Sequence, residues 1–168
     1  APTRMLVPEE YWDYALKVAK EEVGSIQVGS SHVEGDDHIG PVVSEVQYNR
    51  IQEYIQLGID EGATLLVGGL GKPSISEDDN LHQLQQHYQT GYYVLPTIFT
   101  DCKPNMKIWI EEIFGPVLCL TKYSSEQEAI TLANDSEYGL TNYLHTYDKE
   151  RQLRLARRLE SGMIEFNS

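Results

Sequence analysis

The sequence predicts an α/β fold, an open, mostly parallel twisted sheet with helices on both faces. Three observations favour this class. First, β-prone apolar runs alternate with segments in which apolar residues recur every three or four positions. Second, successive predicted strands are joined through helices, as parallel strands require. Third, the chain has 168 residues, 40% of them apolar, which suffices for a buried core. We therefore expect residues 1–168 to form a single domain.

The first part of the chain predicts a strand, a helix and a polar loop. Residues 3–7 are β-prone, and Pro8 suits the first position of a helix because its missing N–H has no partner to lose there. We expect this helix to end at Gly24 and to bury one face. The apolar residues of that face are Trp12, Ala15, Leu16, Ala19 and Val23. A polar loop over 25–40 follows.

A second helix is predicted from a cap at Ser44 to about Gly62, with a strand over 63–67 directly after it. Gly58 lowers the helix propensity of this segment. Its predicted buried face comprises Ile51, Tyr54, Ile55 and Ile59.

The middle of the chain is less regular. Residues 71–90 are polar and rich in Gln and His, which indicates a surface insertion. Residues 92–100 are β-prone but contain Pro96, so we expect an edge strand or two short strands. A single helical turn is expected within 104–110.

The last third has the clearest local signals. Five elements are expected: a strand over 117–122, a helix capped at Ser125, a strand over 142–147, a helix from Asp148 to about Ser161, and a strand over 163–166. Glu128 stands three residues after Ser125, which is the spacing of a capping box. Gly162 suits the stop after the last helix.

Composition excludes several classes of partner. The net charge of −13 argues against nucleic acids and anionic membrane surfaces, since both repel an acidic chain. No apolar run approaches the roughly 20 residues of a membrane helix. Two cysteines are too few for a disulfide scaffold, so a reduced, cytoplasmic setting is expected. The five histidines lack the spacing of metal ligands, and we expect no metal site.

The most informative motif is Glu-Glu-Ile-Phe-Gly-Pro-Val at 111–117, directly before a predicted strand. A carboxylate beside an aromatic ring at a sheet edge could hold a sugar hydroxyl and a planar ring together. From the residues alone, Glu112 is better explained as a solvent-facing turn acid. Core packing explains Phe114 about as well as a ligand contact does.

Several collinear stretches resemble the NAD(P)-dependent aldehyde dehydrogenase family over nearly the whole chain. In order, they are Ala-Pro-Thr-Arg at 1–4, Gly-Pro-Val-Val-Ser at 40–44, Glu-Gly-Ala-Thr at 61–64 with Gly-Gly at 68–69, Gly-Tyr-Tyr at 91–93 with Pro-Thr-Ile-Phe at 96–99, the motif at 111–117, Ala-Asn-Asp at 133–135 with Tyr-Gly-Leu at 138–140, and Ala-Arg-Arg-Leu at 156–159 with Gly-Met at 162–163. The resemblance implies a catalytic-domain fold. It also implies that the chain starts just after the family's nucleophile cysteine.

The resemblance implies oxidation of an aldehyde to a carboxylic acid with NAD or NADP, through a cysteine thiohemiacetal. Glu112 matches the carboxylate that holds the cofactor ribose, and Phe114 matches the aromatic near the nicotinamide ring. The family's nucleophile, general base and nucleotide-binding lobe match nothing in this chain. We therefore expect an excised piece of the catalytic domain that contains no catalytic residue, is inactive alone and has no cofactor bound. Glu111 is expected to face solvent or to form an ion pair.

The two cysteines are poor candidates for the nucleophile. Cys119 lies inside a predicted strand, where a small buried residue is expected. Lys103 could activate Cys102, but Asp101 opposes it, and the matching family position is not catalytic. Asn134 is expected to be structural. Departures from the family pattern at 71–90, Trp109 and Glu165 leave the substrate class open.

Two other functions stay open for the whole protein. One is a non-catalytic oligomerisation or scaffold relative, and the other is a reductase of the same superfamily that acts on an acyl phosphate or thioester. An excised lobe would expose apolar surface, so we expect a homo-oligomer, with a dimer favoured. The expected small-molecule partners of the whole protein are the aldehyde and the nicotinamide cofactor.

Overall fold

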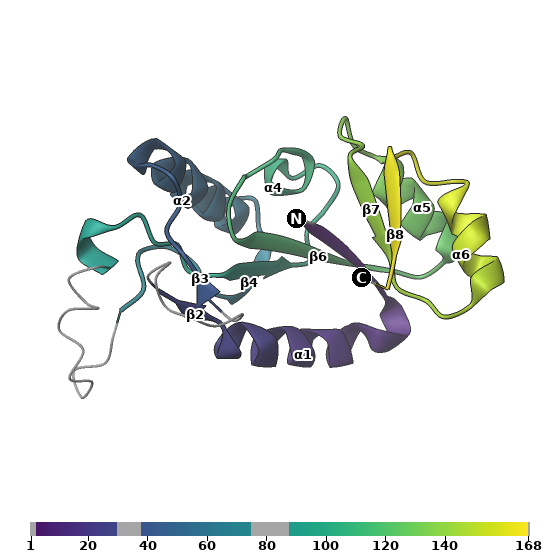
Figure 1. Ribbon diagram of the computed structural model, residues 1–168, viewed down its shortest axis with the longest axis horizontal. Helices are drawn as coiled ribbons and strands as arrows, with labels where there is room; N and C mark the ends of the chain where they lie inside the picture. The colour runs from purple at the N-terminus through teal and green to yellow at the C-terminus, as the bar shows by residue number, and fades with distance from the viewer. Residues whose placement is uncertain (1–2, 30–37, 75–87, 168) are drawn as a thin grey trace.

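A four-stranded sheet forms the centre of the molecule, and helices cover both of its faces (Figure 1). The computed structural model describes residues 3–29, 38–74 and 88–167. In spatial order the strands are β1 (Arg4–Pro8), β6 (Val117–Tyr123), β5 (Thr97–Thr100) and β4 (Thr64–Val67). β6 pairs in parallel with β1 and β5, and β4 is antiparallel to β5. The predicted mostly parallel α/β class is therefore confirmed.

The first helix begins later than the sequence predicts. Pro8 ends β1, a short 3₁₀ turn η1 (Glu9–Tyr11) follows, and α1 runs over Trp12–Ser25. No residue of α1 is fully buried, but every residue of the predicted apolar face is half-buried, and the helix lies along the sheet (Figure 1). The prediction located the right face and placed the helix start four residues too early.

Helix α2 (Glu45–Asp60) packs against the other face of the sheet together with α4 (Lys107–Ile110). Its predicted cap is confirmed, because the Ser44 hydroxyl accepts a hydrogen bond from the N–H of Gln47 at 3.2 Å. Ile51 and Ile55 are completely buried. Ile59, predicted to be buried, is 39% exposed.

Gly58 occupies the buried place that periodicity assigns to Ile59. A Cβ atom at Gly58 would lie 2.9 Å from Cδ1 of Ile108 and 3.0 Å from Cζ of Phe99. The missing side chain lets α2 approach α4 and β5 closely, which offsets the helix propensity that glycine loses.

Strand β5 lies inside the sheet, between β6 and β4, so the prediction of an edge strand is wrong. All four of its residues are buried between β6 and β4. Pro96 precedes the strand, so its missing N–H removes nothing from the ladder. The first N–H of the strand, that of Thr97, donates to the carbonyl oxygen of Pro116 at 2.9 Å.

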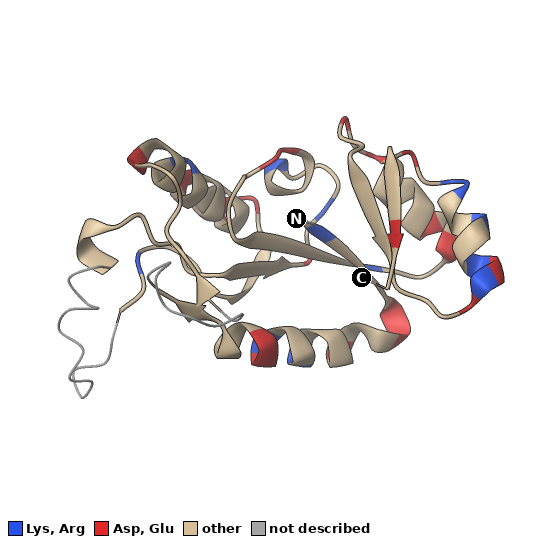
Figure 2. Cartoon of the chain, in the orientation of Figure 1, with Lys and Arg blue, Asp and Glu red and all other residues tan. Residues whose placement is uncertain are grey.

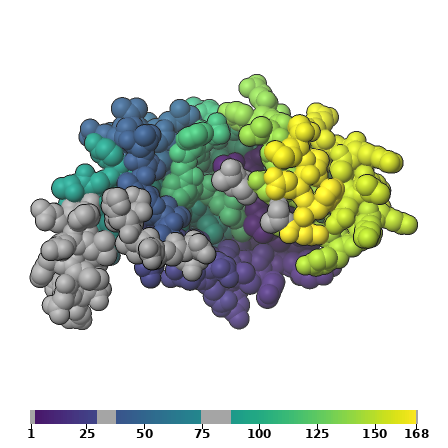
Figure 3. All heavy atoms as spheres, in the orientation of Figure 1, coloured from purple at the N-terminus to yellow at the C-terminus, as the bar shows by residue number. Residues whose placement is uncertain are grey.

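The chain after β6 forms a second, smaller unit at one end of the molecule, seen in light green to yellow in Figure 3. Its elements are α5 (Glu126–Asn134), β7 (Thr141–Leu144), α6 (Lys149–Ala156) and β8 (Met163–Phe166). β7 and β8 pair in parallel and are joined through α6, as the predicted crossover requires. The last helix is shorter than predicted, and β7 ends before the exposed Tyr147.

Both predicted caps in this unit are present. The Ser125 hydroxyl accepts from the N–H of Glu128 at 3.2 Å. In a capping box the Glu128 carboxylate would accept from the N–H of the cap residue itself. Here it accepts from the N–H of Ser124, one residue before the cap, at 2.8 Å. Asp148 caps α6 by accepting from two N–H groups of its first turn.

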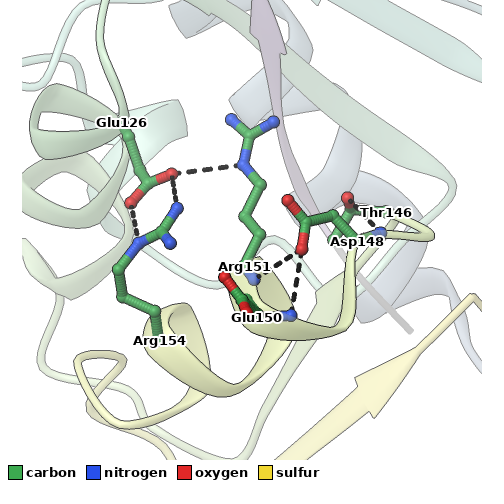
Figure 4. A network of polar contacts seen from close by, with 6 residues as sticks. All are labelled: Glu126, Thr146, Asp148, Glu150, Arg151 and Arg154. Atoms are coloured by element: carbon green, nitrogen blue, oxygen red, sulfur yellow. Dashed lines mark hydrogen bonds and ion pairs between the residues drawn. The ribbon is translucent and has the colours of Figure 1, made fainter.

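A carboxylate at the start of α5 holds α6 in place (Figure 4). Arg154 donates to both oxygens of Glu126 at 2.9 Å, and Nε of Arg151 donates to one of them at 3.2 Å. The hydrogen bonds from Arg154 lower the pKa of the Glu126 carboxyl below its ordinary value. This planar, bidentate pair fixes the N-terminal end of α5.

The predicted polar loop over 25–40 begins and ends in a short parallel pair, β2 (Gln27–Val28) and β3 (His38–Ile39). Most of the predicted insertion at 71–90 lies outside the described residues, so its surface character stays a prediction. Within its described end, Tyr88 is buried and its hydroxyl donates to the carbonyl oxygen of Val28.

Charged residues are distributed unevenly over the molecule. In Figure 2 the basic residues gather most densely on α6, while acidic residues are spread over the other elements. Among the described residues, no helix has both the length and the apolar character to cross a membrane. Within the same ranges no group of His, Cys, Asp and Glu could hold a metal ion.

Candidate functional site

The loop that contains Glu112 and Phe114 connects α4 to β6 and is held through its backbone by α2. Arg50 Nη2 donates to the carbonyl oxygen of Glu112 at 2.9 Å. Nε2 of Gln47 donates to the carbonyl oxygen of Phe114 at 2.8 Å and to that of the preceding residue at 3.1 Å. Gln47, Arg50 and Tyr54 are spaced by three and four residues, so one face of α2 presents all three to the loop.

The backbone of the loop is strained at Phe114, whose φ is 61°. A bulky aromatic in the left-handed region typically costs about 1–3 kcal/mol and persists only where its surroundings impose it. Gly115 follows, and a Cβ there would lie 2.5 Å from Cδ1 of Ile51. The close approach of the loop to α2 and the hydrogen bonds from Gln47 therefore impose this conformation together.

The backbone of Glu112 is fixed, but its carboxylate is free. Its N–H donates to the hydroxyl oxygen of Tyr138 at 3.3 Å, and its carbonyl is bound by Arg50. The carboxylate is exposed and forms no hydrogen bond or ion pair with any residue in the described parts of the chain. An exposed carboxylate that has no protein partner and stands on a fixed backbone is available to a ligand.

Phe114 does not pack into the core of the described chain. Its side chain is 70% exposed, which removes the core-packing explanation that the sequence left open.

Glu111, which precedes Glu112 in the loop, accepts a hydrogen bond from the hydroxyl of Tyr54. This bond raises the pKa of Tyr54 above its ordinary value. Glu111 is exposed, as predicted, but its partner is a phenol and not a cation.

A cavity of about 580 Å³ lies at the opposite end of β6, where the parallel strands β1 and β6 finish. Its lining includes Glu10, Tyr11, Tyr123 and Arg151. Because Glu112 precedes the start of β6 and Tyr123 ends it, this cavity is separate from the loop.

Both cysteines are buried, with 3% of Cys102 and 1% of Cys119 exposed. The Cys119 thiol lies 3.4 Å from the carbonyl oxygen of Ile108. A hydrogen bond with Cys119, burial and the charge of Asp101 raise the pKa of the Cys102 thiol. Neither thiol has the access that a nucleophile needs, and the pKa of Cys102 is raised where a nucleophile needs it lowered.

The Cys102 thiol is expected to make the protein less stable at alkaline pH. Its pKa is raised in the folded state, so the folded chain keeps this proton after an unfolded thiol, with a pKa of about 8.5, has lost it. Below about pH 8.5 the thiol is protonated in both states and the free energy of unfolding does not depend on it. Above about pH 8.5 the free energy of unfolding falls by about 1.4 kcal/mol per pH unit. Urea unfolding at about pH 8 and about pH 10 measures the fall. A Cys102→Ala protein with an equally steep fall would contradict this prediction.

The fold and the loop define a class, an α/β protein that presents a carboxylate and an aromatic ring from a strained turn beside its sheet. The model of the aldehyde dehydrogenase family matches residues 1–168. The chain belongs to the aldehyde dehydrogenase family, as its sequence motifs indicate.

Solved structures agree with this assignment. An aldehyde dehydrogenase of Bartonella henselae is 51% identical with a TM-score of 0.89, and the match covers 100% of this chain and 33% of that one. Aldehyde dehydrogenase C of Pseudomonas syringae, a mutant complexed with NAD⁺ and octanal, is 37% identical with a TM-score of 0.88, over 100% of this chain and 32% of that one. Betaine aldehyde dehydrogenase of Staphylococcus aureus, in complex with NAD⁺, is 32% identical with a TM-score of 0.88, over 99% and 31%. The chain thus spans about a third of the length of the relatives it matches.

Sequence reasoning selected Glu112 and Phe114 but missed the residues that hold them. Gln47 and Arg50 recur at helical spacing on the predicted second helix, which was a usable signal. Tyr138 belongs to a stretch that carries the family resemblance, but its hydrogen bond with the N–H of Glu112 was not predicted. Asn134, predicted to be structural, donates to the carbonyl oxygen of Arg158 at 2.8 Å and ties α5 to the end of α6.

Proposed function

We propose that this chain is part of an enzyme that oxidises an aldehyde to a carboxylic acid with NAD or NADP. A cysteine outside this chain would attack the carbonyl carbon to form a thiohemiacetal, loss of a hydride would leave a thioester, and hydrolysis of that thioester would release the acid and the free thiol. The nicotinamide cofactor, when bound, supplies a hydride acceptor. The proposal rests on the family and on the loop at 111–114, because the chain spans only a third of its relatives.

The observation that carries the proposal is the contrast between a fixed backbone and free side chains in this loop. Glu112 presents a carboxylate without a partner in the described residues, and Phe114 presents an exposed ring. A carboxylate can accept hydrogen bonds from two neighbouring hydroxyl groups, as on a ribose. An aromatic face can contact a planar ring. Both residues therefore fit a nicotinamide nucleoside.

The role of the protein in this proposal is positioning. Gln47 and Arg50 hold the loop backbone through its carbonyl oxygens, so the position from which Glu112 reaches the ligand is fixed. Fixing the ribose fixes the ring that takes part in the reaction, which lowers the entropy cost of reaching the reactive geometry. Catalysis itself is assigned to groups outside this chain, since both of its thiols are buried.

The whole protein is expected to form NADH or NADPH when an aldehyde is added, with the carboxylic acid as the product. Octanal and betaine aldehyde are suitable probes, because relatives are complexed with the first or named for the second. Reduced-cofactor absorbance and product analysis with either cofactor measure the reaction. Consumption of the reduced cofactor with an acyl phosphate or thioester would favour the reductase alternative. Cofactor binding absent under all conditions would favour the scaffold alternative.

The remaining expectations stay predictions. A homo-oligomer is consistent with the exposed apolar residues Val43, Leu140 and Met163. The cytoplasmic setting rests on the cysteine content alone.

A further inference from the structure

Arg4, the first residue of β1, caps the far end of α5. Its guanidinium donates hydrogen bonds to three carbonyl oxygens, those of Leu132 at 3.3 Å, Ala133 at 3.1 Å and Asp135 at 3.3 Å. The last carbonyls of a helix have no partner within it and form the negative end of its dipole. A single arginine therefore fixes the C-terminal end of α5, opposite the end that Glu126 fixes.

The same guanidinium lies over the ring of Trp109, with its carbon 5.0 Å from the ring centroid. Trp109 is 3% exposed and belongs to α4, the element directly before the Glu112 loop. A cation over an aromatic face is attracted most strongly when the pair is shielded from water. Arg4 thus connects three elements, β1, α4 and α5.

Two short paths lead from these contacts to Glu112. Along the chain, Trp109 is followed three residues later by Glu112. On the other side, Asp135 is followed three residues later by Tyr138, whose hydroxyl oxygen accepts from the N–H of Glu112. Both paths begin at the guanidinium of Arg4 and end at the backbone of Glu112.

We propose that Arg4 is a positioning residue that fixes the Glu112 loop relative to α5 and so sets the affinity for the nicotinamide nucleotide. It acts through Trp109 on one side and through the α5 end and Tyr138 on the other. It touches no substrate or cofactor in this scheme. The inference rests on the proposed function of Glu112.

The test is made on the whole protein with NAD⁺ as the probe and calorimetric titration as the measurement. Arg4→Met keeps a long stem and removes the charge and every hydrogen bond. It is expected to raise the Kd for NAD⁺ by about tenfold, the lower end of what losing hydrogen bonds to the charged Glu112 would cost. Tyr138→Phe cuts one of the two paths, so the double variant should lose less affinity than the two single losses combined.

Arg154→Met is the matched control, because it removes an arginine of α6 that binds Glu126 at the opposite end of α5. It should lower the Tm and leave the Kd for NAD⁺ within about twofold, the margin for distant sites. An Arg4→Met protein that loses Tm but keeps its Kd shows a purely structural arginine and overturns the inference. If it does not fold, Arg4→Lys, which keeps the charge but not the planar fork, is judged by the same Kd.

The two levels of the proposal fail differently. If Glu112→Gln leaves the Kd for NAD⁺ unchanged, the proposed function of the loop fails. If Glu112→Gln weakens binding while Arg4→Met and Arg4→Lys do not, only the positioning role of Arg4 fails.

Discussion

A polypeptide of residues 1–168 produced alone is expected to form no NADH from an aldehyde, although it carries the residues proposed to hold the cofactor. The proposed reaction needs a thiolate that can reach the substrate. Cys102 and Cys119 are both buried, and the raised pKa of Cys102 keeps that thiol protonated at neutral pH. In a serine protease, which also forms a covalent intermediate, loss of the nucleophile alone lowers kcat by about a millionfold.

The measurement compares this polypeptide with the whole protein under identical conditions, using octanal, betaine aldehyde and either cofactor. A thiol reagent that reacts only after denaturant is added shows that the polypeptide is folded and its thiols are buried. The prediction is wrong if the isolated chain forms NADH and Cys102→Ala or Cys119→Ala abolishes the activity.

The elements that the sequence predicts well are those with local signals. Ser44, Ser125 and Asp148 each cap a helix as expected, because a cap depends on residues within one turn. The strands beside these helices follow from short apolar runs. The parallel pairing of β7 with β8 follows from helix α6, which joins them.

The predictions that failed depend on distant neighbours. The central position of β5 comes from pairing with β4 and β6, which no property of residues 97–100 contains. Gly58 replaces Ile59 in the interior because Phe99 and Ile108 lie against the helix there. Periodicity describes a face of a helix but not how closely another element approaches it.

The candidate site shows the same division. Glu112 and Phe114 could be chosen from a contiguous motif and its resemblance to a family. The hydrogen bond from Arg50 to Glu112 spans 62 residues, and that from Glu112 to Tyr138 spans 26. The sequence therefore predicted the groups proposed to contact a ligand but not the contacts that hold them.

Glu112→Gln is expected to weaken NAD⁺ binding by the whole protein about ten- to hundredfold. The amide keeps the size of the side chain and can still accept a hydrogen bond, but it loses the charge. Hydrogen bonds to a charged group contribute about 1.5–3 kcal/mol, which corresponds to this change in Kd. The effect belongs to the ligand and not to the fold, because the carboxylate has no partner among the described residues. The Tm should therefore stay unchanged.

Glu111→Gln provides a control one residue away with the same chemical change. Its carboxylate accepts from Tyr54 and is already engaged, so this variant should leave the Kd for NAD⁺ within about twofold. Calorimetric titration with NAD⁺ measures the Kd of both variants and of the unmodified whole protein. Equal losses in the two variants would point to the net charge of the loop instead of a specific contact. If Glu112→Gln binds NAD⁺ as tightly as the unmodified protein, Glu112 does not bind the ribose, because that role rests on its carboxylate alone.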